Sequence, residues 1–521
     1  GASGMLQISS SLLGTSFVNG FSHIQIGNSK TGEILIGGTN TYIDPLTLQS
    51  ASNVNMNVGS SMTGLAGENA SLVLWVDADG NQSGSIFLNE STIQTNGGHL
   101  WMAGGEESAT PWNGLTVGDG SSYADATHSF NASTFKNGMT IYRSSLASTG
   151  GNIFISGIAD GVSGASAGYN GVYLEQSTLS SGAGAIDLNA FSTGTNNDGS
   201  WHYGLLMGTI VDNTAAIIES TSGPITINGE TDFSENTHGA GVGLYSFGNP
   251  NSEVIIRTVS GAIDITGRLN STGFDGQYGG IFLFGSGEEQ IVSQTGNISL
   301  EGTSANPNVA GINQWPGNTT SAIGFDGTNA FTGDITFNSN TFINYAGVIT
   351  ANNLELLGSG VVYDFSNAGN NVNSLTANTG SVTYLDGDEL TVNDITATGE
   401  IEIATESGNL TLSGNVTTTS TSADAIILNA GKSESIGTET GGDIIVSGSP
   451  TVTTGATGIS KLFSGSELSS TGLTDLVGGS SNVRKEVDET TTTFDPVLSA
   501  GNAYALYRYQ DIIQLTIASQ N

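Results

Sequence analysis

The sequence predicts an all-β chain that folds as a right-handed parallel β-helix with projecting loops. Three observations lead to this prediction: 76 of the 521 residues are glycine, only 11% are charged, and one short strand motif recurs along most of the chain. Eight prolines cannot support a collagen repeat, and the abundance of Gly, Ser, Thr and Asn disfavours long helices. Because 36% of the residues are hydrophobic, the chain can bury a core and is not expected to be disordered.

The recurring motif is Gly-x-apolar-x-apolar. Its alternation has a period of two, which is typical of a strand with one buried face. We expect the glycine to form a tight corner before each strand, in a conformation that other residues resist. The copies are Gly32–Ile36, Gly84–Leu88, Gly151–Ile155, Gly184–Leu188, Gly223–Ile227, Gly261–Ile265, Gly296–Leu300, Gly333–Phe337, Gly380–Tyr384, Gly399–Ile403, Gly408–Leu412 and Gly442–Val446.

A second series of strands interleaves with the first. Because the two series alternate, we expect each sequence repeat to form two coils of a solenoid, with apolar ladders stacked inside. A set of separate β-sandwiches is the alternative, although sandwich strands lack a fixed motif at a coil-like period. The second series comprises Gly171–Leu174, Gly204–Met207, Gly241–Leu244, Gly280–Leu283 and Gly311–Ile312.

The motif pattern divides the chain into five ranges. Residues 1–4 resemble an expression remnant, 5–104 form N-terminal coils, and 105–150 are an irregular or projecting insertion where the motif lapses. Residues 151–453 form the main repeat region, and 454–521 form a C-terminal capping or border segment. The Gly/Ser/Asn-rich stretches 156–170 and 190–203 are predicted to be loops that project from the coils.

The charge balance narrows the partners. With 47 acidic and 10 basic residues, the net charge is −37, which disfavours nucleic acid and anionic membranes as partners. There is no cysteine, so no disulfide framework is expected. Apolar runs fall short of the roughly 18–20 residues of a membrane span, so the chain is not expected to span a membrane.

The last segment carries the most specific motifs. It contains Leu462–Ser466 (LFSGS), Ser470–Thr474 (STGLT) and Ala503–Tyr509 (AYALYRY), and similar coils run through Ser407–Thr418 (SGNLTLSGNVTT). This part resembles the segment that closes the repeat region of filamentous-haemagglutinin-like exoproteins of Gram-negative bacteria. The resemblance covers roughly residues 150–521. It departs at Tyr509-Gln-Asp, where the family has Glu-Gln-Pro.

This resemblance implies a secreted adhesin of the bacterial outer surface. The family is exported by two-partner secretion through an outer-membrane transporter, and its partners are glycans or proteins on host or neighbouring cells. The export domain of the family carries NPNL-type motifs. The only similar string, Asn306-Pro-Asn-Val309, is interpreted as a turn within the coils, so we expect the export domain to be missing from this fragment.

Asp77, Asp79 and Asn81 have the one-three-five spacing of a calcium loop. Position six is Gln82 and position twelve is Leu88, which excludes an EF-hand. A looser Ca²⁺ site is one interpretation of this loop. A simple Asp/Asn/Gly turn is the other.

Trp112, Trp201 and Trp315 fall in loop-like contexts. Exposed aromatic rings beside Asn, Asp and His could stack on sugar rings, which would suit an adhesin. Alternatively, each ring covers part of the coil stack.

No catalytic residues are predicted, so we do not expect an enzyme. Before residue 484 the only arginines are Arg143, Arg257 and Arg268, which leaves few candidate bases. One competing hypothesis is a polysaccharide-active β-helix lyase or hydrolase similar to phage tailspikes, which would need clustered carboxylates. Another is a Ca²⁺-dependent structural element of a surface layer.

Overall fold

The computed structural model describes residues 6–8, 13, 17, 19–68, 70–120, 123–124, 127–130, 133–161, 168–194, 201–209, 214–233, 238–246, 251–273, 278–315, 321–324, 331–489 and 497–510. The expected expression remnant at residues 1–4 lies outside them. The chain divides into two units, residues 1–347 and 348–521, and each is described by itself. Within the described ranges, no helix is long and apolar enough to cross a membrane.

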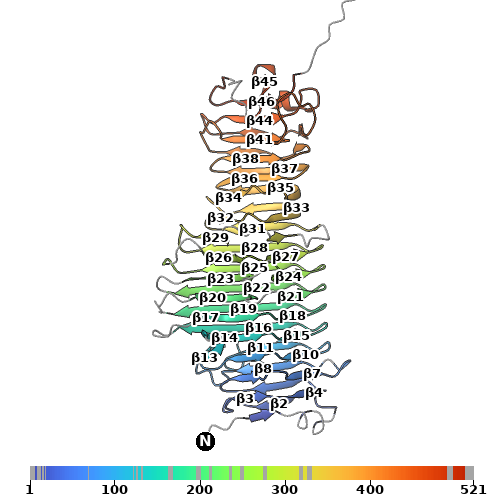
Figure 1. Ribbon diagram of the computed structural model, residues 1–521, viewed down its shortest axis with the longest axis vertical. Helices are drawn as coiled ribbons and strands as arrows, with labels where there is room; N and C mark the ends of the chain where they lie inside the picture. Colours follow the sequence, from blue (N-terminus) through green and yellow to red (C-terminus); the bar gives the residue numbers. More distant parts are fainter. Residues whose placement is uncertain are drawn as a thin grey trace, which may run out of the picture. The chain divides into compact units, whose positions relative to one another are not determined.

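The predicted parallel β-helix is confirmed. In unit 1, successive coils contribute strands to three parallel sheets, here named A, B and C (Figure 1). Sheet A contains β1 (Leu6–Ile8), β3 (Ile34–Ile36), β6 (Val54–Met56), β9 (Ile86–Asn89), β14 (Ser133–Tyr142), β17 (Gly168–Glu175), β20 (Trp201–Thr209), β23 (His238–Ser246), β26 (Gly279–Gly285), β29 (Ala310–Gln314) and β32 (Ile343–Asn344).

In each coil the chain runs from sheet A to sheet C and then to sheet B. Sheet B contains β2 (Ile24–Gly27), β5 (Leu46–Gln49), β8 (Leu72–Val76), β11 (Leu100–Gly104), β16 (Ile153–Gly161), β19 (Ile186–Gly194), β22 (Ile225–Phe233), β25 (Ile263–Leu269), β28 (Ile298–Ser304) and β31 (Ile335–Ser339). Sheet C contains β4 (Thr39–Tyr42), β7 (Ser61–Gly64), β10 (Thr92–Gln94), β15 (Ser145–Ala147), β18 (Thr178–Ser180), β21 (Ala215–Ser220), β24 (Glu253–Thr258), β27 (Glu288–Ser293) and β30 (Ala322–Ile323).

Each sequence repeat makes one coil, so the prediction of two coils per repeat is wrong. From Gly151 to Phe337 the first motif series lies on sheet B, where Ile186 pairs with Ile225, whereas its copies Gly32–Ile36 and Gly84–Leu88 lie on sheet A. The second series also lies on sheet A, where Leu205 pairs with Val242. The third strand of the coil, on sheet C, has no glycine motif that would reveal it. Neighbouring strands of these sheets run parallel, which excludes the antiparallel β-sandwich alternative.

The glycines of the first series are needed for close stacking. At Gly184, Gly223 and Gly261 φ is not positive, so the predicted left-handed corner is wrong there; it holds at Gly84, where φ is 148°. A Cβ on Gly223 would lie only 1.9 Å from the carbonyl oxygen of Gly184 in the preceding coil. That oxygen also accepts a hydrogen bond from the Ser181 hydroxyl at 2.6 Å. The corner therefore follows a Ser/Thr-x-x-Gly pattern.

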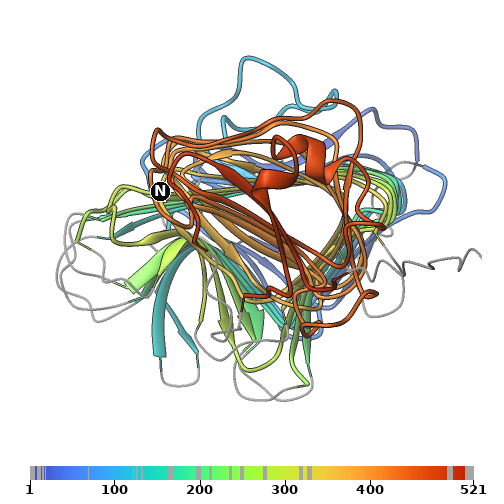
Figure 2. The same ribbon diagram turned by 90° about the horizontal axis from the view of Figure 1, so that it is seen from above.

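In the stretches predicted to be loops, the described residues 156–161, 168–170, 190–194 and 201–203 are strands, whereas residues 162–167 and 195–200 lie outside the described ranges. Beyond the coil, the ends of B strands and the starts of A strands continue outward as facing ribbons, which Figure 2 shows among the green strands. We call these ribbons the wing (residues 157–161, 168–171, 190–194, 201–204, 229–233 and 238–241). Buried and less buried positions continue to alternate in the wing, but the buried positions hold small residues such as Ala190 and Ser192. Because small residues are also common in loops, the sequence pattern resembles that of a loop.

A glycine neck joins the wing to the coil. A Cβ on Gly229 of sheet B would lie 2.1 Å from the carbonyl oxygen of Gly241 on sheet A, and a Cβ on Gly241 would lie 2.5 Å from that of Gly229. The two sheets can approach this closely only because neither residue has a side chain. Beyond the neck, Tyr169 and Phe233 are buried inside the wing.

The range 105–150 divides into two parts. Residues 105–120 form a loop that is closed by an isolated bridge between Glu107 and Gly118. The later part of the range, from β14 onward, belongs to the coils, because Met139 of β14 pairs with both Ile86 and Val172. Between them, β12 (Tyr123–Ala124) pairs with β16, and β13 (Thr127–Phe130) pairs antiparallel with β14.

Unit 2 is built from two parallel sheets, named D and E. Sheet D contains β33 (Val348–Leu357), β35 (Asn371–Thr379), β37 (Leu390–Ala397), β39 (Leu410–Leu412), β40 (Val416–Thr418), β42 (Ile444–Val446) and β43 (Val452–Thr453). Sheet E contains β34 (Val362–Phe365), β36 (Ser381–Asp386), β38 (Ile401–Thr405), β41 (Ile426–Ala430), β44 (Ser460–Ser464), β45 (Val483–Lys485) and β46 (Ala503–Tyr507). Short helices α2 (Leu473–Leu476) and η1 (Ser480–Asn482) lie between β44 and β45.

The motifs that carry the family resemblance lie in the last coils of unit 2. Arg508 is 1% exposed and reaches back across the coils, where Nη1 donates to the carbonyl of Ala430 at 2.5 Å and Nη2 to that of Gly442 at 2.8 Å. Oδ1 of Asp443 accepts the backbone N–H of Ser466 at 3.0 Å and the hydroxyl of Ser470 at 3.2 Å. These contacts tie the described residues 464–489 and 497–508 onto the preceding coils as a cap.

Candidate functional site

The residues predicted to bind calcium lie in one loop after β8. Asp77 has a φ of 49° and is 1% exposed, whereas Asp79 and Asn81 are exposed. Oδ1 of Asp77 accepts the backbone N–H of Ser83 at 3.2 Å, and Nδ2 of Asn81 donates to Oδ2 of Asp79 at 2.9 Å. The loop thus uses Asp77 as an internal acceptor, as an Asp-centred turn does.

Burial raises the pKa of Asp77 to about 6, and the negative charge of Asp79 adds to this effect. The backbone N–H groups of Ser83, Gln82 and Asn81 oppose it. Within the described ranges, no group of three or more His, Asp or Glu side chains could hold a metal ion. Calcium binding by this loop stays a prediction.

Trp112 lies in the loop 105–120 and is partly buried. Its ring centroid is 5.6 Å from that of His99 and 6.0 Å from that of Phe154. With Leu115, it packs on a buried group that lies on the outer face of sheet B and in the loop: Val73, Trp75, Ala78, Trp101, Ala103 and Val117. These contacts favour the covering role for Trp112 over sugar stacking.

The other two tryptophans come together on the outer face of sheet A. Trp201 begins strand β20, so its prediction as a loop residue is wrong, and Trp315 directly follows β29. The Phe284 ring lies between them, with its centroid 6.0 Å from Trp201 and 4.7 Å from Trp315. Although they are far apart in the sequence, both rings belong to one surface.

We call this surface the aromatic patch. Trp201 is 41% exposed, whereas the rings beneath it are buried, with Tyr278 at 4% and Phe284 at 7%. Burial raises the pKa of Tyr245 to about 12, and the nearby Glu175 carboxylate adds to this shift. The patch comprises Trp201, Tyr203, Tyr245, Tyr278, Phe282, Phe284 and Trp315.

Five members of the aromatic patch were not identified from the sequence. Phe282 lies within the second motif series, in Gly280–Leu283, and Phe284 directly follows this copy, which on its own predicts only a coil strand. Their signal was available, because alternate positions 281 and 283 are apolar and face inward, so 282 and 284 must face outward. Aromatic residues at outward positions of successive A strands predict a patch of this kind.

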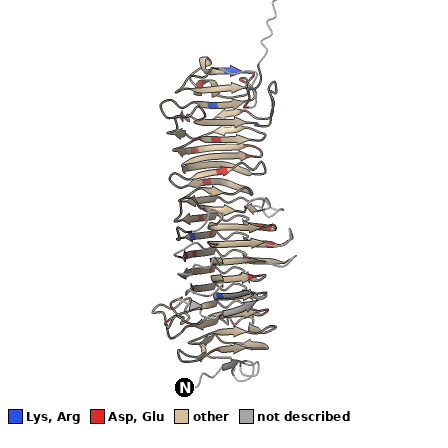
Figure 3. Ribbon diagram, turned by 60° about the vertical axis from the view of Figure 1, so that its left-hand side comes forward, with Lys and Arg blue, Asp and Glu red and all other residues tan. Residues whose placement is uncertain are grey.

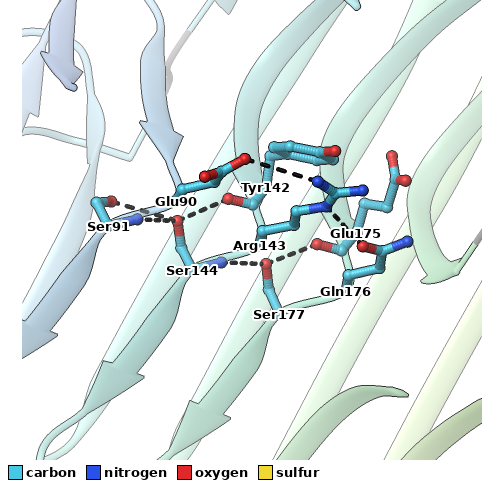
Figure 4. Close-up of polar contacts among 8 residues, drawn as sticks. All are labelled: Glu90, Ser91, Tyr142, Arg143, Ser144, Glu175, Gln176 and Ser177. Carbon is cyan, nitrogen blue, oxygen red and sulfur yellow. Dashed lines mark hydrogen bonds and ion pairs between the residues drawn. The ribbon is translucent and has the colours of Figure 1, made fainter. Parts of the chain in front are cut away.

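A polar ladder crosses the corner between sheets A and C (Figure 4). Glu90, Arg143 and Gln176 occupy the same corner in successive coils, each with φ between 46° and 48°. Inside the corner, the backbone N–H of Ser91 donates to the Ser144 hydroxyl at 3.0 Å, and that of Ser144 to the Ser177 hydroxyl at 2.9 Å. These hydroxyls satisfy backbone groups that the bend removes from the sheet ladders.

Outside the corner, Arg143 links its neighbours. Its Nη1 lies 3.6 Å from a Glu90 carboxylate oxygen, and its Nε donates to Oε1 of Gln176 at 2.7 Å (Figure 4). Burial raises the pKa of the adjacent Glu175, although a hydrogen bond from Tyr173 and the charge of Arg143 both oppose this shift. Because Arg143 is engaged by Glu90 and Gln176 and the serine hydroxyls accept backbone N–H groups of neighbouring corners, we interpret this ladder as structural.

Acidic residues are spread over the coils of both units, and basic residues are few (Figure 3). The described basic residues are also partly neutralised: Arg257 lies 2.6 Å from Glu219 and Lys461 lies 2.5 Å from Asp424. This distribution offers no basic stripe for a phosphate backbone within the described ranges. Comparison of the chain with protein-family models, curated proteins and solved structures finds no match in any of the three.

Proposed function

We propose that this chain is part of a secreted adhesin of the bacterial surface, in which the coils display a contact surface for glycans or proteins of other cells. The observation that carries the proposal is the aromatic patch. A tryptophan that is 41% exposed and rests on buried aromatic rings is a preformed hydrophobic anchor. Trp and Tyr dominate the residues that contribute most to binding at protein interfaces.

The patch is suited to weak contacts that act in number. Its buried rings restrict the movement of Trp201, which lowers the entropy that binding must remove. Many copies on one cell surface then convert weak contacts into firm attachment through effective concentration. The acidic surface disfavours nonspecific contact with nucleic acid and anionic lipid. Export by an outer-membrane two-partner-secretion transporter remains part of this proposal.

The test is attachment of beads coated with the 521-residue chain to epithelial and bacterial cells, with and without Ca²⁺. We expect Trp201→Ala to lower attachment at least about tenfold, because hot-spot truncations cost roughly 2 kcal/mol or more. Trp201→Phe retains an aromatic ring and should keep part of the attachment. Val362→Ala in unit 2, where the side chain is 48% exposed, serves as the control for loss of an exposed apolar group.

Unchanged attachment of folded Trp201→Ala would remove the aromatic patch from the proposal. Failure of the wild-type chain to attach to any cell would remove the contact role altogether and leave only a stalk. Release of reducing ends from polysaccharides by the wild-type chain would instead favour the competing enzyme hypothesis. Lateral assembly that depends on Ca²⁺ would favour the surface-layer hypothesis.

A further inference from the structure

A groove of about 590 Å³ lies on the outer face of sheet C, away from every residue discussed as a contact site. Strands β18, β21, β24 and β27 form it, so it crosses successive coils. Its volume falls within the range of roughly 300–1,000 Å³ that is typical of ligand sites.

The floor of the groove is apolar. Ile255 pairs with Gln290 in the neighbouring coil, and Arg257 pairs with Val292, so all four side chains point outward from sheet C. Ile255 is nevertheless only 6% exposed and Val292 only 4%, because longer side chains flank them. A recessed aliphatic floor can receive the C–H face of a ring.

The walls carry polar side chains that are not engaged by the protein. The side-chain amides of Gln290 and Gln294 and the hydroxyl of Ser180 form no hydrogen bond with any described residue, and all three line the groove. An amide offers both donors and an acceptor, and a hydroxyl does the same. Such a lining matches a ligand whose own groups both donate and accept, which is the property of sugar hydroxyls.

The charges in the groove select against anions. Nε and Nη2 of Arg257 donate to one carboxylate oxygen of Glu219, at 3.0 Å and 2.6 Å, so the cation is already paired. Glu253 lines the same groove, and its carboxylate forms no ion pair with a described residue. A net negative charge repels polyuronates and sulfated glycans.

We propose that this groove binds a neutral oligosaccharide, with sugar rings over Ile255 and Val292 and hydroxyls on the Gln290 and Gln294 amides. The proposal deepens the proposed adhesin function by naming a ligand class. It uses a different face from the aromatic patch, since the patch lies on sheet A and the groove on sheet C.

The test is calorimetric titration of the 521-residue chain with cellotetraose, maltotetraose and tetra-N-acetylchitotetraose. Tetragalacturonate serves as the anionic probe and tetralysine as a cationic peptide probe. We expect at least one neutral tetrasaccharide to bind, and the Gln290→Ala/Gln294→Ala double variant to lose at least about tenfold in affinity. Val292→Trp should abolish binding by filling the floor. Gln94→Ala, on the outer face of sheet C but outside the groove, should bind as the wild type does.

Glu253→Gln sharpens the charge argument. This variant should keep neutral binding within about twofold and should bind tetragalacturonate more tightly than the wild type does, because one repelling charge is gone. Failure of all neutral probes to bind would overturn the proposal, as would equal affinity in the double variant. Preferential binding of tetralysine would assign the groove to basic peptides instead. Trp201→Ala should leave oligosaccharide binding unchanged, so failure of the groove and failure of the aromatic patch are distinguishable.

Discussion

The coils that carry the wing in unit 1 are much longer than the first coils of unit 2. The N-terminal coils of unit 1 and the last coils of unit 2 do not differ in this way, because Asn40 and Ser61 are 21 residues apart and Asn409 and Asp443 are 34 apart. In unit 1, the hydrogen-bonded residues Asn189 and Asn228 of adjacent coils are 39 residues apart, whereas in unit 2 Asn393 and Ser413 are only 20 apart. Much of the additional length in unit 1 lies outside the coil interior, in the wing and at the corners. Trp201 lies at the outer end of a wing strand, so the additional chain length positions its exposed aromatic ring.

The comparison separates two uses of one architecture. A coil needs only short strands and small corners to bury its apolar ladder, as Ile401–Thr405 and Leu410–Leu412 show in unit 2. Any longer coil places side chains where they contribute little to the core, so those positions are available for recognition. Accordingly, both proposed contact surfaces belong to unit 1, whereas unit 2 carries the buried cap around Arg508.

The largest expected effect compares one motif glycine of each unit, chosen because the space around them differs. In unit 1, Gly223→Ala would place Cβ 1.9 Å from the Gly184 carbonyl oxygen, so the backbone must move. In unit 2, Gly399 holds the same motif position, but its Cβ would lie 3.2 Å from the Gly380 oxygen. We expect Gly223→Ala to cost more than about 4 kcal/mol or to prevent folding, and Gly399→Ala to change stability by less than about 1 kcal/mol.

Hydrogen exchange followed by mass spectrometry measures each unit separately under identical conditions. Peptides covering β19, β22 and β25 should lose protection in Gly223→Ala, whereas those covering β36 and β38 should keep it in Gly399→Ala. Equal effects of the two substitutions would show that the distance to the neighbouring carbonyl oxygen does not decide the cost of a Cβ at this motif position.

The second effect concerns the cap of unit 2. Arg508→Ala removes both donors to the carbonyls of Ala430 and Gly442 and leaves Asp443 without the nearby cation. We expect a loss of about 3–5 kcal/mol, because an uncompensated buried charge and two unpaired acceptors remain. Urea unfolding, with exchange of residues 426–464 as the local readout, measures it.

Arg484→Ala is the matched control in the same cap. The Arg484 guanidinium lies 5.2 Å from the Tyr504 ring centroid and donates to the carbonyl of Ser481 at 3.0 Å, at a partly exposed position. Its loss should cost less than about 1 kcal/mol. If Arg508→Ala were no more harmful than Arg484→Ala, the cap would not depend on the buried arginine.

The sequence predicted the coil well because its signal is local. The alternation of apolar and polar residues in Gly184–Leu188 and in the other copies of the motif indicates which side chains face inward, and it can be read without knowing which strands are adjacent. The role of Gly223 could not be read in this way, because the contact that requires it comes from Gly184 in another coil. Repetition of Ser/Thr three positions before these glycines was visible, and it would have identified the corner.

The candidate sites were less predictable for the same physical reason. Trp201 and Trp315 were identified one by one, but their common surface exists only because β20, β23, β26 and β29 pair in register. The sheet C groove joins Glu219, Arg257 and Gln290, which no motif connects in the sequence. Asp77 and Asp79 were correctly placed in a turn-forming loop, yet only the structure shows that one carboxylate is buried and the other exposed.

The smallest expected effect compares a buried aspartate in each unit. The folded-state pKa of Asp77 is about 6, above its ordinary value of 3.8, so the folded state holds the proton more tightly than the unfolded state does. The contribution of Asp77 to stability is therefore fully present below pH 3.8 and is lost as the pH rises through about 6. We expect Asp77→Asn to flatten this slope and to stabilise the chain at pH 7 by roughly 1–3 kcal/mol. Asn also tolerates the left-handed φ of 49°.

Asp386 in unit 2 should respond in the opposite direction, although its pKa is also raised, to about 7, mainly by burial. Its Oδ2 accepts the Tyr384 hydroxyl at 2.7 Å and the Val372 N–H at 3.0 Å, and its Oδ1 accepts the Asp388 N–H at 3.1 Å. An Asn amide cannot accept on both sides, so Asp386→Asn should destabilise unit 2 by roughly 1–3 kcal/mol. Urea unfolding from pH 4 to pH 8 measures both variants, with exposed Asp264→Asn in unit 1, whose charge does not act on Asp77, as the control that keeps the slope. Repeating the series with Ca²⁺ also tests the calcium loop, because a bound ion would stabilise the wild type above pH 6 and reverse the sign for Asp77→Asn. If the free energy of unfolding of Asp77→Asn depended on pH as steeply as that of the wild type, a group other than Asp77 would be responsible for the dependence.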